Sequence, residues 1–144
     1  MLQFRAAFLF ATGLVLCSIL AVQLGCQQTQ RPVEEARPSQ LAIFYGRFIS
    51  KHQGQSPANE KELKDFIRQE DASVNVDEIF ISPRDKEPYV VRYKLGMAMP
   101  GAEMVTVHEK TGANGKKMVG LATGQVRMVD DDEFQKLVGR PTGT

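Results

Sequence analysis

An apolar run near the N-terminus constrains this chain more than any other feature. Residues 6–22 contain no charged side chain, and Arg5 is the only charged residue ahead of them. A run of this length is sufficient for a helix that inserts into a membrane, so it predicts either a secretion signal or a membrane anchor. Both alternatives place the rest of the chain outside the cytoplasm.

The residues that follow the run distinguish three fates for it. No A-x-A-like cleavage site of an ordinary signal peptide fits the sequence well. The run instead leads into Val-Gln-Leu-Gly-Cys at residues 22–26, which resembles the lipobox of bacterial lipoproteins. Gly25 and Cys26 match that pattern, and Gln23 departs from its usual aliphatic residue. The resemblance implies that Cys26 becomes diacylated and then forms the new N-terminus; an uncleaved helical anchor and simple secretion remain as alternatives.

Cysteine content and charge exclude several classes of protein. The 144 residues include two cysteines, and Cys17 lies inside the apolar run, so neither a disulfide-stabilised mini-domain nor a stable bridge to Cys26 is expected. Eighteen basic and 17 acidic side chains leave a net charge of +1, which excludes a strongly basic nucleic-acid-binding protein. We therefore predict a protein of the bacterial cell envelope, anchored on its periplasmic side, with no nucleic-acid partner.

The chain divides into four parts. Residues 1–25 form the signal or insertion segment, residues 26–38 a polar tether, residues 39–139 a globular domain and residues 140–144 a tail. Pro32 and Pro38 interrupt the polar stretch, which predicts that it does not continue a helix and that it reaches roughly 40 Å when extended.

Helical periodicity comes first in the domain. Apolar residues at positions 41, 44, 45, 48 and 49 follow a spacing of i, i+3, i+4, i+7 and i+8, with Ser39 as N-cap and Gly54 at the end. Asn59, followed by Glu62 three residues later, is typical of a helix start and predicts a second amphipathic helix.

An alternation of apolar and polar residues with a period of two follows, which predicts half-buried antiparallel strands. It occurs at residues 89–95, 104–109, 117–122 and 125–129, separated by the turn residues Met99-Pro100-Gly101, 111–115 and Thr123-Gly124. Acidic residues 130–133 then suit the start of a short terminal helix. The predicted fold class is α+β: two N-terminal amphipathic helices, a small antiparallel β-meander of three to four strands and a short C-terminal helix.

Two segments of the domain are similar to the C-terminal domains of type II secretion pseudopilins. Residues 82–89 read Ser-Pro-Arg-Asp-Lys-Glu-Pro-Tyr, and residues 120–126 read Gly-Leu-Ala-Thr-Gly-Gln-Val in the last predicted hairpin. The resemblance implies a helix followed by a small antiparallel meander over residues 40–130. The chain differs from pseudopilins in two respects: its apolar helix lacks a glutamate at the fifth position, and residues 31–38 contain two prolines. It resembles a pseudopilin-type head on a lipid tether.

Residues that could support catalysis are few. The two histidines are His52, predicted near the end of the first helix, and His108, predicted in a strand; neither belongs to a metal-binding or nucleophile motif. We predict no enzyme activity and no cofactor, and the only predicted site residue is the lipidation site Cys26. An uncommon enzyme would need scattered residues, such as His108 with Glu103 or Glu109.

Two segments raise the possibility of a ligand. The four acidic residues 130–133 could hold calcium, as the resemblance to major pseudopilins also implies, but helix capping explains them without a metal. Residues 112–117 resemble a phosphate-binding loop, but a strand rather than a helix is predicted to follow, which favours a hairpin.

Charge is distributed unevenly along the domain. Residues 79–129 contain eight basic and four acidic side chains, whereas residues 59–78 contain three basic and seven acidic ones. One interpretation is a pair of solvated faces that attract each other. The alternative is that the polar face of the sheet meets an anionic envelope surface or an acidic partner.

Together these features predict an exported, membrane-anchored lipoprotein that acts as a non-catalytic interaction module of the cell envelope. Its partners would be the membrane, through the lipid anchor, and a protein or cell-wall component. The alternative is an accessory, pseudopilin-like component of a secretion system.

Overall fold

The computed structural model describes residues 32–95 and 103–138. Predictions made for the apolar run, Cys17, Cys26, the turn Met99-Pro100-Gly101 and the tail lie outside these residues.

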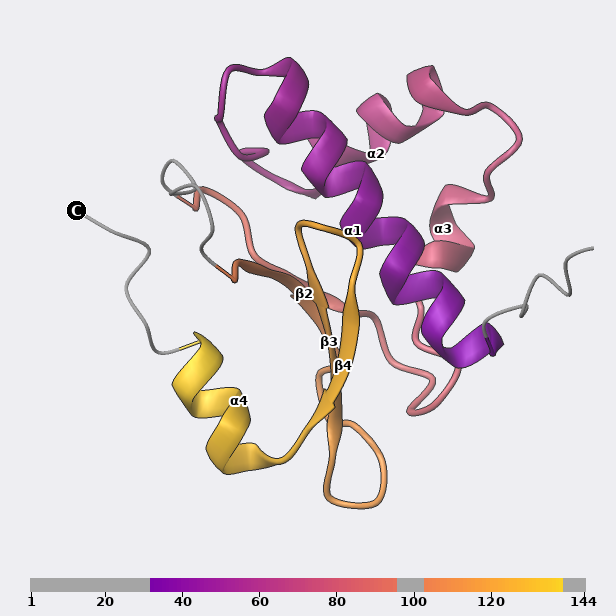
Figure 1. Ribbon diagram of the computed structural model, residues 1–144. Coiled ribbons are helices and arrows are strands. Elements are labelled where there is room, and N and C mark those ends of the chain that lie inside the picture. The colour runs from indigo at the N-terminus through magenta and orange to yellow at the C-terminus, as the bar shows by residue number, and fades with distance from the viewer. Residues whose placement is uncertain (1–31, 96–102, 139–144) are drawn as a thin grey trace, which may run out of the picture. The chain divides into compact units, whose positions relative to one another are not determined.

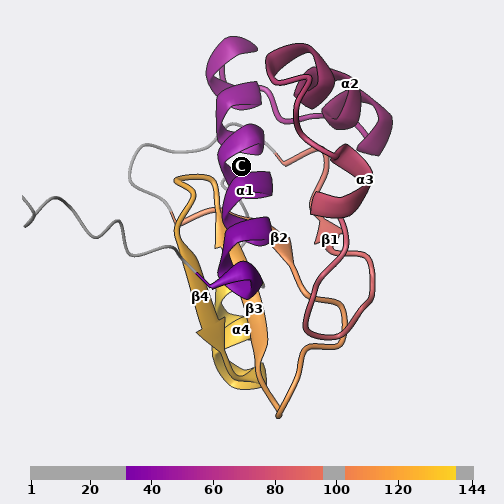
Figure 2. The ribbon, with the colours of Figure 1, turned by 90° about the vertical axis from the view of Figure 1, so that its right-hand side faces the viewer.

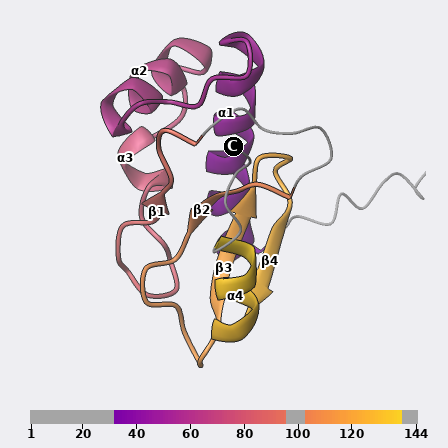
Figure 3. The ribbon, with the colours of Figure 1, turned by 90° about the vertical axis from the view of Figure 1, so that its left-hand side faces the viewer.

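A four-stranded antiparallel sheet with the strand order β1-β2-β3-β4 forms the centre of the domain. Helix α1 lies against one face, and α4 lies against the other (Figures 1, 2 and 3). The predicted α+β class and the antiparallel meander are confirmed. The elements in chain order are α1 Val33–Lys51, α2 Glu60–Glu70, α3 Val76–Ile79, β1 Val90–Val91, β2 Val105–His108, β3 Lys117–Leu121, β4 Val126–Val129 and α4 Asp131–Val138.

Helix α1 begins earlier than the sequence predicts. Its first residue is Val33, with the carbonyl of Pro32 accepting the first helical N–H groups, and Pro38 lies inside it. The predicted N-cap at Ser39 and the tether reaching Pro38 are therefore wrong. Pro38 removes one helical hydrogen bond, but its side chain is fully buried, so packing against the sheet offsets the missing bond.

Two glycines allow α1 to lie directly on strand β3 and the residue that follows it. A Cβ atom on Gly46 of α1 would lie 2.2 Å from the carbonyl oxygen of Ala122, and one on Gly120 of β3 would lie 3.1 Å from both the Ala42 Cβ and the Pro38 carbonyl oxygen of α1. The first distance is incompatible with a side chain, and the second is tighter than ordinary contact. The absence of side chains at these two positions sets the close approach of helix and sheet, which positions the far end of α1.

The main core lies between α1, the following helices and the sheet, and it includes Leu41, Tyr45, Leu63 and Val107. A second core occupies the opposite face, where Val105, Val119, Leu121 and Val129 pack against Phe134 of α4.

This second core corrects the prediction that one face of the strands is solvated. Residues 105–107 and 118–121 are buried. The reason is that α4 packs on the face of the strands that the alternating pattern predicted to be exposed to solvent.

Capping of helices α2 and α4 follows the sequence, unlike that of α1. The Asn59 side chain accepts the N–H of Glu62 at 3.0 Å, and the Asp130 side chain accepts the N–H of Glu133 at 2.8 Å. Both predicted helix starts are confirmed. The hairpin prediction for residues 112–117 is also confirmed, since Ala113 and Lys116 pair across the turn.

No helix in the described parts of the chain is long and apolar enough to cross a membrane.

Candidate functional site

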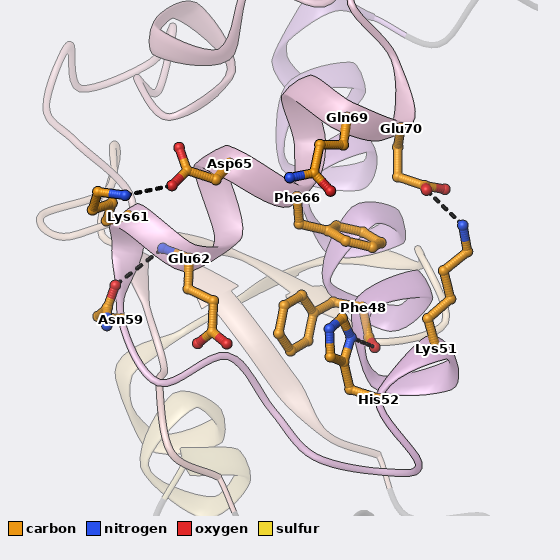
Figure 4. Close-up of a pocket in the computed structure, with 10 residues that line it drawn as sticks. All are labelled: Phe48, Lys51, His52, Asn59, Lys61, Glu62, Asp65, Phe66, Gln69 and Glu70. Carbon is orange, nitrogen blue, oxygen red and sulfur yellow. Dashed lines mark hydrogen bonds and ion pairs between the residues drawn. The ribbon is translucent and has the colours of Figure 1, made fainter.

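A groove of about 610 Å³ lies between the C-terminal end of α1 and helix α2 (Figure 4). Both helices are held on the main core by buried side chains, among them Tyr45 of α1 and Leu63 and Ile67 of α2. The walls of the groove are therefore fixed by packing rather than by loops. Ten residues line it: Phe48, Lys51, His52, Asn59, Lys61, Glu62, Asp65, Phe66, Gln69 and Glu70.

Three aromatic rings form the floor of the groove. Phe48 and Phe66 meet edge to face, with ring centroids 5.2 Å apart. The imidazole of His52 stacks on Phe48 with a centroid separation of 3.8 Å. Because Phe48 and His52 are four residues apart at the end of α1, they lie on the same side of the chain.

The orientation of His52 is set by the helix end. His52 is the C-cap residue of α1, and its Nδ1 lies 2.8 Å from the carbonyl oxygen of Phe48. The carbonyl can only accept, so Nδ1 donates the proton, and in the neutral ring Nε2 is left as an acceptor. The structure places His52 where the sequence predicted it, at the C-terminus of the first helix.

Two ion pairs form the rim. Lys51 contacts Glu70 at 2.5 Å, and Lys61 contacts Asp65 at 2.6 Å. The Lys61 ammonium, by hydrogen bonding and by its charge, lowers the pKa of Asp65 below its usual value. Lys51 also lies over the ring of Phe66, 5.9 Å from its centroid.

Glu62 differs from the other carboxylates of the groove. One of its oxygens accepts the backbone N–H of Ala58, the residue before the N-cap Asn59, at 2.6 Å. It has no cationic partner within residues 32–95 and 103–138. In Figure 4 its carboxylate points away from α2 on the side where the Phe48 ring lies, and His52 lies beyond that ring. The lining thus contains two lysines and three carboxylates, with one carboxylate unmatched.

A second polar cluster is buried beneath the loop of residues 82–88. Arg84 donates to Glu109 at 2.8 Å, and the same carboxylate accepts from the Ser82 hydroxyl at 2.9 Å and from the N–H of Met118 at 2.8 Å. Glu109 is fully buried. Its charge is satisfied on every side, so this cluster fastens the loop to the sheet and offers no open site.

Asp85 completes this attachment. Its carboxylate accepts the N–H groups of Thr111 and Gly112 at 3.2 and 3.0 Å, and that of Glu87 at 3.2 Å. Burial alone would raise the pKa of Asp85, but the N–H donors outweigh it and lower the pKa below its usual value.

His108 does not form the catalytic arrangement considered from the sequence. Its ring packs edge to face against Phe134, at 4.8 Å between centroids, and burial lowers its pKa. Glu109 binds Arg84, and Glu103 pairs with Arg127. Neither carboxylate acts on the imidazole. His108 is also less solvated than the sequence predicted, because α4 covers it.

The acidic residues 130–133 start α4, as predicted, with Asp130 as the cap. Within the parts of the chain that are described, no group of three or more His, Cys, Asp or Glu side chains could hold a metal ion.

Half of the eight basic side chains in residues 79–129 are paired with carboxylates. These are Arg84, Lys110, Lys117 and Arg127. Lys86, Lys94 and Lys116 are exposed. Because α1 and α4 cover the two faces of the sheet, these exposed lysines lie in the loops around it and do not form one polar face of the strands.

Sequence reasoning did not find the groove. The sequence predicts position 48 only as part of the apolar stripe of the first helix, and one interpretation makes the charged residues 59–78 a solvated face. The signal that could have revealed it is the i, i+4 pair Phe48 and His52 at a helix end, followed after a short loop by a capped acidic helix.

Comparisons of the chain with protein families, with curated protein sequences and with solved structures find no match.

Proposed function

We propose that this protein is exported, is held at a bacterial envelope membrane by lipids on Cys26, and acts there as a non-catalytic module that binds a protein or cell-wall partner in the α1/α2 groove. The observation that carries the proposal is the position of the groove. It lies at the C-terminal end of α1, whereas the chain that follows Cys26 enters at the N-terminal end.

The geometry of α1 supports this arrangement. With 19 residues the helix is about 28 Å long. Because α1 begins at Val33, the link from Cys26 spans at most roughly 24 Å, shorter than the tether predicted from the sequence. In this proposal the C-terminal end of α1 and helix α2 form the walls of the groove.

The chemistry of the groove supports binding rather than turnover. Its lysines are paired with Glu70 and Asp65, and His52 is fixed by Phe48 and is not hydrogen-bonded to a carboxylate or a hydroxyl among the described residues. The ten lining residues include no serine, threonine or cysteine, so His52 has no nucleophile beside it of the kind that nucleophilic catalysis uses.

Site-specific photo-crosslinking in cells tests the binding role. A photoreactive residue at Gln69, which lines the groove, is compared with one at Gln135, which is exposed on α4. We expect a discrete crosslinked envelope component from position 69 and none from position 135. Equal crosslinking from both positions would contradict a role for the groove. Cys26→Ser should release the protein from the membrane fraction.

One observation favours a second candidate, an accessory pseudopilin-like component of a secretion system. Helix α1 passes through Pro38 without ending and lies along the sheet. The prolines of residues 31–38, one of the two differences from pseudopilins, therefore do not break the helix at Pro38. This candidate predicts co-purification with a secretion filament or its membrane platform after crosslinking. Failure to co-purify under conditions that retain known filament subunits would exclude it.

A further inference from the structure

The contacts of the Lys51 ammonium group in the groove indicate which kind of ligand the groove can bind. Lys51 places its Nζ over the ring of Phe66 and contacts Glu70. A ring face and a carboxylate together stabilise a cation, the first through its quadrupole and the second through its charge. The groove is therefore built from groups that accept an ammonium or guanidinium ion.

A second combination of the same kind is open. Glu62 has no cationic partner in the described residues, and it lines the groove on the side where the Phe48 ring lies, with His52 stacked beyond that ring (Figure 4). Because Nδ1 of His52 donates to the carbonyl of Phe48, Nε2 is the ring nitrogen that can accept a hydrogen bond from a ligand, as the Glu62 carboxylate can. Both groups are acceptors, so a ligand that binds them must carry hydrogen-bond donors.

The surroundings of the groove favour the same sign of charge. Both lysines in the lining are neutralised by carboxylates, at 2.5 and 2.6 Å, so they do not repel an incoming cation strongly. Residues 59–78, which include α2, contain seven acidic and three basic side chains. Five of the acidic side chains form ion pairs, and Glu62 and Asp71 are the two for which no ion pair is found among the described residues. Such a field attracts basic partners and repels acidic ones, including anionic lipid.

We propose that the groove binds an exposed segment of a partner protein through a lysine or arginine side chain, whose cation lies between Glu62 and the stacked rings of Phe48 and His52. This inference rests on the binding role proposed above and names the chemistry of the partner. The aliphatic stem of the side chain covers the aromatic floor, while the backbone of the segment lies near the amides of Asn59 and Gln69.

The two histidines of the chain provide the test. His52 lies in the groove, and His108 lies beneath α4. In NMR spectra of the full-length protein in detergent micelles, the imidazole signals of His52 therefore report binding, and those of His108 serve as an internal control. Three capped peptides are titrated: Gly-Arg-Gly-Lys-Gly, Gly-Gln-Gly-Gln-Gly and Gly-Glu-Gly-Glu-Gly. We expect the basic peptide to shift the His52 signals saturably, less so at high salt, and the His108 signals to stay in place.

Two matched variants assign the effect to one carboxylate. Glu62→Gln keeps an acceptor for the N–H of Ala58 but removes the charge, and it should lower the affinity of the groove for the basic peptide roughly fivefold. Glu60→Gln makes the same change two residues earlier, on a side chain that pairs with Lys64 outside the groove, and should change the affinity less than twofold. Thermal melting confirms that both variants are folded.

Several results would overturn the proposal. The His52 signals could respond equally to all three peptides, or not at all to the basic one. The loss of affinity could be as large for Glu60→Gln as for Glu62→Gln.

Two other results would name a different occupant. Movement of the His52 signals with protein concentration alone would make a second copy of the chain the occupant. Saturable binding of a cell-wall glycan instead of the peptide would make the glycan the occupant. None of these depends on Cys26, so the anchoring part of the proposed function is tested separately by the mass of the mature N-terminus.

Discussion

The guanidinium of Arg84 donates to the carboxylate of Glu109 across 2.8 Å, and the two side chains are 8% and 0% exposed. Buried charges of this kind are costly when one partner is removed, because the other is left without compensation. The pair joins the loop of residues 82–88 to strand β3 through the N–H of Met118.

Removing one member of this pair should therefore destabilise the domain strongly. Arg84→Met is expected to lower the free energy of unfolding by about 3 kcal/mol in urea titrations, and adding Glu109→Gln should restore part of the loss. Lys110→Met, which removes an exposed ion pair with Glu87, should cost less than about 0.5 kcal/mol. If Arg84→Met cost no more than Lys110→Met, the cluster would not stabilise the loop.

Gly46→Ala tests the direct contact between α1 and β3. In an exposed helix this substitution raises stability by about 1 kcal/mol. Here the new methyl would lie 2.2 Å from the backbone oxygen of Ala122, so we expect a loss of about 2 kcal/mol or more, seen as a lower melting temperature. Ser50→Ala, at an exposed position of the same helix, should leave stability unchanged or slightly higher. A stabilised Gly46→Ala variant would contradict the packing of α1 on the sheet.

The carboxylate of Asp85 should make the domain sensitive to acid. Its pKa in the folded protein lies below the unfolded value of 3.8, so its contribution to stability is present above that pH and is lost as the pH falls through the folded pKa. The difference in unfolding free energy between the wild type and Asp85→Asn should be constant above about pH 5 and should shrink below about pH 4.

The donors to Asp85 provide a second measurement. The backbone amide signals of Thr111 and Gly112, which donate to this carboxylate, should shift with the same acid midpoint. One combination of results would assign the pH dependence to another group. In it, the stability difference between the wild type and Asp85→Asn shrinks as the pH falls below about 5, but the amide signals of Thr111 and Gly112 do not shift.

Loss of a helix cap is a milder test within the groove wall. Asn59→Ala removes the acceptor for the N–H of Glu62 and should lower the free energy of unfolding by about 1 kcal/mol, while Asn59→Asp should retain the cap. Amide hydrogen exchange over residues 60–63 should increase in the alanine variant alone. Unchanged exchange would mean that α2 begins without help from Asn59.

Local signals in the sequence predicted much of this fold. Asn59 and Asp130 cap the helices as expected, and the strands follow the alternation at residues 104–109 and 117–122 because a period of two is a direct consequence of strand geometry. Pro38 misled the prediction of the first helix, since the penalty of an internal proline is visible in the sequence but the burial that offsets it is not.

Contacts between distant residues account for the rest. Arg84 and Glu109 are separated by 25 positions and were counted as surface charges, and nothing local indicates that Phe134 covers Val119. The groove combines the end of α1 with a wall from α2, and lining residues such as Glu62 are read from the sequence only as part of a helix start. Periodicity assigns a residue to a face, but it does not say which element covers that face.

The mass of the mature N-terminus tests the central claim most directly. The protein is purified from membranes, digested and analysed by mass spectrometry. An exported, lipid-anchored module predicts that residues 1–25 are absent and that the first peptide begins at Cys26 with the added mass of a diacylglycerol group. A peptide containing Cys26 with a free thiol, or one that still continues into residues 1–25, would contradict it.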